Sequence, residues 1–173
     1  MNRLFLFILA FVLLGVASCG DDDPETATVT ISEKNESGLT GTVTFTEEDG
    51  TVTMVAELAN ATVGNHAIHI HATGDCSAAD GTSAGGHWNP TSEEHGEWDG
   101  TMFHRGDIGN ITVGNDGKGT LTRSTDLWCI GCDDANKNIV DKAIIVHEGP
   151  DNFSSQPSGA AGARIGCGTI NED

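Results

Sequence analysis

Residues 41–58 read GTVTFTEEDGTVTMVAEL, and this stretch decides the fold. Two runs of alternating side chains, rich in Thr and Val, flank Asp49-Gly50. This dipeptide favours the positive φ angles of a tight hairpin turn. Because successive side chains of a strand point to opposite faces, the alternation places the apolar residues on one face. The stretch therefore predicts a β-hairpin with one buried side.

The same alternation recurs on both sides of this hairpin. A second hairpin is predicted over 109–124, with its turn at Asn115-Asp116-Gly117. Single strands are predicted over 27–33, 66–72, 142–148 and 164–170. No window has a convincing helical period. About eight short strands predict an all-β fold, either an antiparallel sandwich or a barrel.

Two connections are too long to be plain turns. They cover residues 73–107 and 148–163. Long ordered loops in a compact domain are usually functional, so we expect both to serve a site.

The first residues predict export. Residues 1–18, MNRLFLFILAFVLLGVAS, combine a positive start at Arg3 with an apolar run too short to cross a membrane, as in a signal peptide. The sequence VASC resembles a bacterial lipobox, which predicts a lipidated Cys19. The alternative is an ordinary signal followed by an unmodified cysteine. A lipid on Cys19 would anchor the protein to a membrane without spanning it.

Residues 19–27 are expected to hold the lipidated cysteine and an acidic tether, GDDDPETA, ahead of the domain over 28–173. The acidic run is either a solvated spacer or a signal for export to the cell surface. We therefore expect an exported bacterial lipoprotein of the periplasm or outer membrane, with surface exposure left open.

The strongly negative net charge of the chain limits the kinds of molecule that it can bind. The chain has 26 acidic and 8 basic residues, a formal net charge of −18 at pH 7. This balance argues against nucleic acid and against anionic membrane surfaces as partners. It fits a soluble exported domain or a protein that binds cations, with membrane contact only through the lipid.

The other cysteines suggest disulfide bonds. Apart from Cys19, the chain has Cys76, Cys129, Cys132 and Cys167. An even number in an exported chain favours disulfides, and three pairings are open. Residues 128–132, WCIGC, match the thioredoxin W-C-x-x-C pattern. Because no βαβ context surrounds them, we favour a local disulfide over a redox motif or a thiol metal site.

Histidines are concentrated in the strand over 66–72, HAIHIHA. His69 and His71 point to one face of this strand, so both imidazoles can reach one metal ion. His66 has the opposite parity and is expected to be a structural, hydrogen-bonded histidine.

More potential ligands follow at spacings that fit no regular element. The loop carries His87, His95 and His104 and closes at Asp107, and His147 ends a later strand. Together with His69 and His71, these are too many ligands for one tetrahedral site. An all-imidazole set suits copper, and three histidines with an aspartate suit zinc. Two neighbouring metal sites are therefore predicted.

Five motifs resemble, in order, those of the copper–zinc superoxide dismutase family. They are HAIHIHATGDC (66–76), SAGGHWNP (83–90), HRGDIGN (104–110), IIVHEGPD (144–151) and AGARIGCG (161–168). The resemblance runs over roughly residues 28–172. It implies an eight-stranded antiparallel Greek-key β-barrel, an immunoglobulin-like sandwich, in which two long loops build the site.

The resemblance also implies a role for each ligand. The implied copper ligands are His69, His71, His87 and His147, and the implied zinc ligands are His87, His95, His104 and Asp107, so that His87 bridges the metals.

Four further residues receive roles in the same way. Asp151 would hydrogen-bond His69 and His95 from behind the metals. Arg164 would bind the substrate anion beside copper, and a Cys76–Cys167 disulfide would help to fix it. Catalytic roles thus fall on Arg164 and His87.

The implied activity is disproportionation of superoxide to oxygen and hydrogen peroxide, with copper and zinc as cofactors. The alternative is a non-catalytic envelope protein that binds or buffers copper on the same fold. A copper-only dismutase is disfavoured because the zinc set is complete. The resemblance leaves monomer and homodimer open.

The sequence departs from the family in its second long loop. Many family members carry lysines there that attract superoxide, whereas residues 148–164 contain none. In so acidic a chain, long-range attraction of the substrate should be weak. Arg105, beside His104, is expected to form a surface ion pair, with partial compensation as the alternative.

Overall fold

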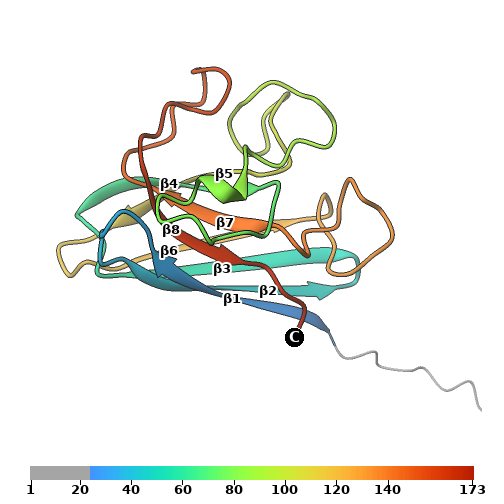
Figure 1. Ribbon diagram of the computed structural model, residues 1–173. Helices are drawn as coiled ribbons and strands as arrows, with labels where there is room; N and C mark the ends of the chain where they lie inside the picture. Colours follow the sequence, from blue (N-terminus) through green and yellow to red (C-terminus); the bar gives the residue numbers. More distant parts are fainter. Residues whose placement is uncertain (1–23) are drawn as a thin grey trace, which may run out of the picture.

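The computed structural model describes residues 24–173. Its strands close into one antiparallel barrel in the order β1-β2-β3-β6-β5-β4-β7-β8 (Figure 1). The strands are β1 (Glu25–Glu33), β2 (Thr40–Glu48), β3 (Thr51–Ala59), β4 (Gly64–His71), β5 (Asp107–Val113), β6 (Gly119–Thr125), β7 (Ala143–His147) and β8 (Arg164–Thr169). The all-β fold predicted from the alternating pattern is confirmed.

Two connections make the barrel a Greek key. Strand β3 pairs with β6 rather than with β4, so residues 60–63 carry the chain to the other side of the barrel. Residues 126–142 carry it back from β6 to β7, which pairs with β4. The last strand closes the barrel against the first, with Ser32 paired to Cys167.

The β2–β3 hairpin has the predicted turn. Asp49 and Gly50 both have positive φ, 51° and 72°. Val43 and Phe45 on β2, and Val52 and Met54 on β3, are fully buried. The apolar side of the alternating pattern therefore faces the barrel interior.

Strand β1 begins earlier than the alternating pattern predicts. The sequence predicts an acidic tether up to residue 27 and a strand over 27–33, whereas β1 begins at Glu25. Glu25 pairs with Glu47 and Ala27 with Phe45, and Ala27 is fully buried. The pairing to β2 extends the predicted strand by two residues, Glu25 and Thr26. The predicted signal peptide and Cys19 lie outside the described residues.

Three long connections between strands contain little regular secondary structure. Residues 72–106 contain one 3₁₀ turn, Thr82–Ala84. In Figure 1, the yellow-green part of this segment and the orange-red loop over 148–163 rise from the same side of the barrel. The third segment, over 126–142, projects at one end of it. Within the described part of the chain, no helix is long and apolar enough to span a membrane.

Candidate metal centre

The structure brings the seven predicted ligands into two groups that share one histidine. In each group, one ligand atom per residue lies within 4.8 Å of the others. The first group is His69, His71, His87 and His147, and the second is His87, His95, His104 and Asp107. Strands β4 and β7 supply most of the first group. The 72–106 loop and the start of β5 supply the second, which explains why the loop needs no regular spacing.

The first group presents unpaired ring nitrogens to a common point. Nδ1 of His69 and Nε2 of the other three histidines are buried and have no hydrogen-bond partner. The opposite nitrogens are occupied, because His71 Nδ1 donates to Gly85 O at 2.9 Å and His147 Nδ1 to Gly162 O at 3.3 Å. A nitrogen that donates to a carbonyl carries the proton, so the other nitrogen carries a lone pair. This tautomer is the one that binds a metal ion.

Burial favours the neutral form of these rings. It lowers the pKa of His71 to about 2, of His147 to about 3 and of His87 to about 4. A buried imidazole resists protonation because its cation would lose hydration. At neutral pH the three rings are therefore uncharged and able to coordinate.

The second group has the spacing of a tetrahedral shell. Asp107 Oδ1 lies 2.8 Å from His87 Nδ1 and 3.2 Å from His104 Nδ1, and the two nitrogens are 3.4 Å apart. Zinc with ligands at about 2.0 to 2.1 Å has ligand-to-ligand edges of about 3.3 Å. His95 Nδ1 lies 3.0 Å from the other oxygen, Asp107 Oδ2. Three imidazoles and one carboxylate thus converge as a closed zinc site requires.

Asp107 is held in its charged form. Its Oδ2 accepts the backbone N–H groups of Gly96 and His104, at 3.1 and 2.8 Å. Burial opposes ionisation, but hydrogen bonds from His104, His87 and His95 hold the pKa of Asp107 well below its usual range. Burial also opposes protonation of His95, yet Asp107 and Asp151 raise the pKa of His95 to about 9. Without metal, this pocket holds a carboxylate whose charge is balanced by His95.

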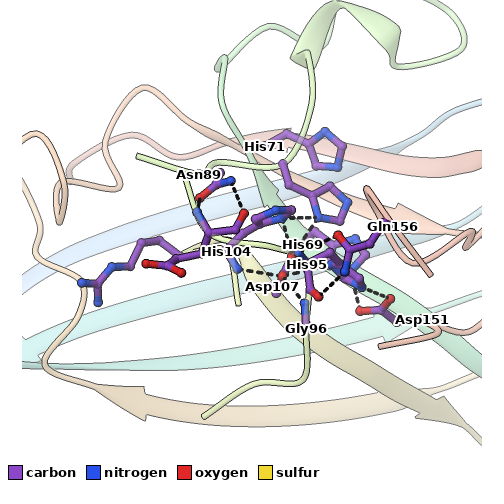
Figure 2. A network of polar contacts seen from close by, with 12 residues as sticks. His69, His71, Asn89, His95, Gly96, His104, Asp107, Asp151 and Gln156 are labelled. Atoms are coloured by element: carbon purple, nitrogen blue, oxygen red, sulfur yellow. Dashed lines mark hydrogen bonds and ion pairs between the residues drawn. The ribbon is translucent and has the colours of Figure 1, made fainter. Parts of the chain in front are cut away.

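Asp151 joins the two groups from behind. Its carboxylate accepts from His69 Nε2 at 2.8 Å and from His95 Nε2 at 2.9 Å, and all three side chains are fully buried (Figure 2). Burial would raise the pKa of Asp151, but these two hydrogen bonds lower it to about 2. The two hydrogen bonds occupy Nε2 of both histidines, so that Nδ1 is the atom that faces a ligand group, the first group for His69 and the second for His95.

The carboxylate of Asp151 is enclosed by its neighbours. Asn110 on β5 accepts the Asp151 N–H at 2.7 Å. Gly159 packs so closely that a Cβ atom would overlap Asp151 Oδ1 and lie 2.8 Å from His95 Nε2. The φ angle of Gly159 is also positive, 74°, which L side chains rarely adopt. Glycine is required here to let the second loop close over the carboxylate.

Arg164 lies beside the first group. Its guanidinium donates to the carbonyl oxygens of Gly81 and Gly85, each at 2.6 Å. Gly85 O is also the acceptor for His71 Nδ1. One loop carbonyl therefore orients both a candidate ligand and the only arginine on β8.

Both remaining cysteine pairs form disulfides. Cys76 bonds Cys167, which ties the 72–106 loop to β8, three residues after Arg164. Cys129 bonds Cys132 within the 126–142 segment. His66 Nδ1 contacts His147 O at 2.9 Å and Nε2 contacts Thr62 O at 2.8 Å, so this ring lies outside both groups, as predicted.

Sequence reasoning missed three residues that support the site. Gln156 makes a two-way contact with the backbone of His95, accepting its N–H at 3.0 Å and donating to its carbonyl at 2.8 Å (Figure 2). Lys34 Nζ donates to Cys76 O at 2.6 Å. Trp128 donates from its indole N–H to Arg105 O at 2.8 Å. No short motif signals these contacts, since each joins residues distant in sequence.

These observations define the class of protein: a closed Greek-key barrel with two adjacent metal sites that share a histidine. The chain matches the family model for copper/zinc superoxide dismutase over residues 39–170, so it belongs to that family. The family binds copper and zinc, and the two ligand groups fit these metals.

A solved structure agrees with this assignment. The crystal structure of the clock protein EA4 superposes with a TM-score of 0.75 at 28% sequence identity. The match covers 88% of this chain and 97% of that chain. The similarity therefore extends over nearly the whole described domain.

Proposed function

We propose that the protein is a superoxide dismutase with copper in the first ligand group and zinc in the second. One observation carries the proposal: Arg164 stands beside a cluster of four unpaired, buried imidazole nitrogens. Family membership alone does not carry it, because one solved structure that the chain resembles is named a clock protein. Turnover of a small anion needs a cation next to the ligands of the redox metal.

The two groups would hold different metals because their donors differ. Four imidazoles suit copper, and the set containing Asp107 suits zinc. When bound, copper supplies one-electron redox chemistry and zinc holds the loop ligands in place. The balanced reaction converts two superoxide anions and two protons to oxygen and hydrogen peroxide.

Arg164 binds and orients the anion in this proposal. Its two terminal nitrogens already donate to Gly81 O and Gly85 O, which fixes the plane of the guanidinium. Hydrogen bonds from a fixed cation to an anion are stronger than those between neutral groups. A guanidinium held in place before the substrate arrives costs no reorganisation during the reaction.

His87 is the residue proposed to handle a proton. Its Nε2 has no protein partner, while its Nδ1 contacts Asp107 at 2.8 Å. Burial lowers the pKa of His87 to about 4 in the metal-free chain, so the ring does not retain an added proton at neutral pH. A proton held at Nε2 can therefore be passed to the reduced product.

The surrounding charge should limit the rate. The net charge is −18, and the loop over 148–164 has no lysine. A superoxide anion would feel net repulsion until it comes close to Arg164. We therefore expect the rate constant to stay flat or rise with ionic strength, since salt screens repulsion as well as attraction.

The test is a direct assay of the chain from Gly20 onward, loaded with copper and zinc. Superoxide disproportionation is measured per bound copper over a range of ionic strength, with the metal-free protein as a control. Rapid turnover that is lost in Arg164→Met at unchanged copper content supports the proposal. Stoichiometric copper without turnover would refute it and favour the copper-buffering alternative.

We further propose that the protein is exported and held to a membrane by a lipid on Cys19. The support is the leader over 1–18 and the VASC sequence. Labelling cells with a fatty-acid analogue tests this: the label should enter the native chain and not Cys19→Ala. Equal labelling of the two chains would refute it.

A further inference from the structure

Trp128 is a buried side chain that the two ligand groups do not include. It lies in the 126–142 segment, directly before the Cys129–Cys132 disulfide, and is only 1% exposed. Its ring contacts Phe45 of β2 edge-on, with centroids 6.0 Å apart. This packing joins Trp128 to the barrel core.

The same indole holds the zinc-binding loop at two points. Its Nε1–H donates to Arg105 O at 2.8 Å, and its ring lies 5.0 Å from that of Trp98. Arg105 directly follows the ligand His104, and Trp98 lies three residues after the ligand His95. Both contacts therefore act on the chain next to a zinc ligand.

The segment that carries Trp128 is fixed independently of that loop. Cys129 N donates to Lys137 O at 2.9 Å, and Ile139 N donates back to Cys129 O at 3.1 Å. Ile130 N donates to Glu47 Oε2, on β2, at 2.7 Å. Since these bonds do not involve the 72–106 loop, Trp128 is a rigid support and does not simply follow the loop.

We propose that Trp128 is a positioning residue of the zinc site, which keeps the loop between His95 and Asp107 in its liganding conformation before metal binds. An unsupported loop would have to be ordered by zinc itself, and the lost conformational entropy would weaken binding. Gln156 secures the His95 backbone from the opposite loop. Trp128, which packs on the barrel core, holds the later part of this loop through Trp98 and Arg105.

This inference rests on the proposed function only in taking the second ligand group as the zinc set. Its readout is zinc affinity and not turnover, so the two proposals fail separately. An inactive protein whose zinc affinity depends on Trp128 would refute only the dismutase proposal.

The experiment compares Trp128→Phe with the unmodified chain from Gly20 onward, by competition for zinc against a chromophoric chelator. Phenylalanine keeps an aromatic ring and removes the N–H donor to Arg105 O. Zinc should bind about 3- to 10-fold more weakly, the effect of one neutral hydrogen bond. In the metal-free protein, amides of residues 96–103 should also exchange with deuterium faster.

The matched control is Val29→Ala, which shortens a fully buried side chain on β1, outside both the 72–106 loop and the 126–142 segment, and so lowers stability. Its zinc affinity should equal that of the unmodified chain. Unchanged zinc binding in Trp128→Phe would overturn the inference. Equal weakening in both variants would also overturn it, since the effect would then be one of global stability.

Discussion

The substitution Asp151→Asn isolates the hydrogen bonds that fix two ligand tautomers. The carboxylate accepts from His69 Nε2 and His95 Nε2 through separate oxygens, at 2.8 and 2.9 Å. An asparagine of the same shape has one acceptor atom and one NH₂ donor. One of the two imidazoles would then face a donor, and it would have to move its proton from Nε2 to Nδ1. That shift blocks the Nδ1 atom that the site needs.

The structure sets the size of the effect. All three side chains are fully buried, so water cannot replace the missing acceptor. Residues that orient metal ligands typically contribute about 10- to 100-fold to metal affinity. This corresponds to about 1.4 to 2.8 kcal/mol. The loss should fall mainly on one metal, copper if His69 changes tautomer or zinc if His95 does.

Chelator competition, performed separately for copper and zinc, measures both affinities. Asp173→Asn is the control, because it removes the same charge from an exposed carboxylate that accepts from Thr28. The control should bind both metals normally. If Asp151→Asn also binds both metals within about twofold of the unmodified protein, Asp151 does not determine the tautomers of His69 and His95.

Three further predictions follow from the same geometry. Arg164→Lys replaces the planar guanidinium, whose two terminal nitrogens reach two carbonyl oxygens, by a single ammonium nitrogen on a flexible stem. Turnover should therefore fall about 10- to 100-fold at unchanged copper content, and an unaffected rate would contradict the proposed role. Gly159→Ala should lower the free energy of unfolding by about 1 to 3 kcal/mol more than Gly162→Ala in urea titrations, because both glycines have positive φ but only the first leaves no room beside Asp151. The metal-free protein should lose stability as pH falls from 6.5 toward 4, because buried histidines with a lowered pKa bind protons only when the chain is unfolded. Three such histidines give a loss of up to about 4 kcal/mol per pH unit. Urea titrations at pH 7, 6 and 5 measure this loss, and an unfolding free energy that does not change with pH would count against the prediction. The histidines concerned are His71, His87 and His147.

Much of the fold could be predicted because its signals are local. Alternation marks each strand, and Asp49-Gly50 marks its hairpin turn within one short window. The start of β1 was missed because Glu25 and Thr26 have no apolar side chain. Their place in the strand depends on pairing with β2, which is formed by residues about 20 positions away.

The ligands could be predicted for a different reason: few side chains can bind copper or zinc. His95 and His104 stand out in a loop without any periodicity, because imidazoles are uncommon and the motifs around them match a family. Gln156, Lys34 and Trp128 do not stand out in this way. A glutamine, a lysine or a tryptophan has many ordinary roles, and only the closed barrel shows which distant backbone atom each one contacts.

The pairing of the first strand with the last sets a condition on how the chain can fold. Because Ser32 and Glu33 pair with Cys167 and Gly166, the barrel cannot close until nearly the whole chain is available. A chain that ends before residue 164 would leave β1 and β7 as open edges, which are templates for aggregation. Contacts between such distant residues also form slowly. Synthesis of the C-terminal strand therefore acts as the step that commits the protein to its native state.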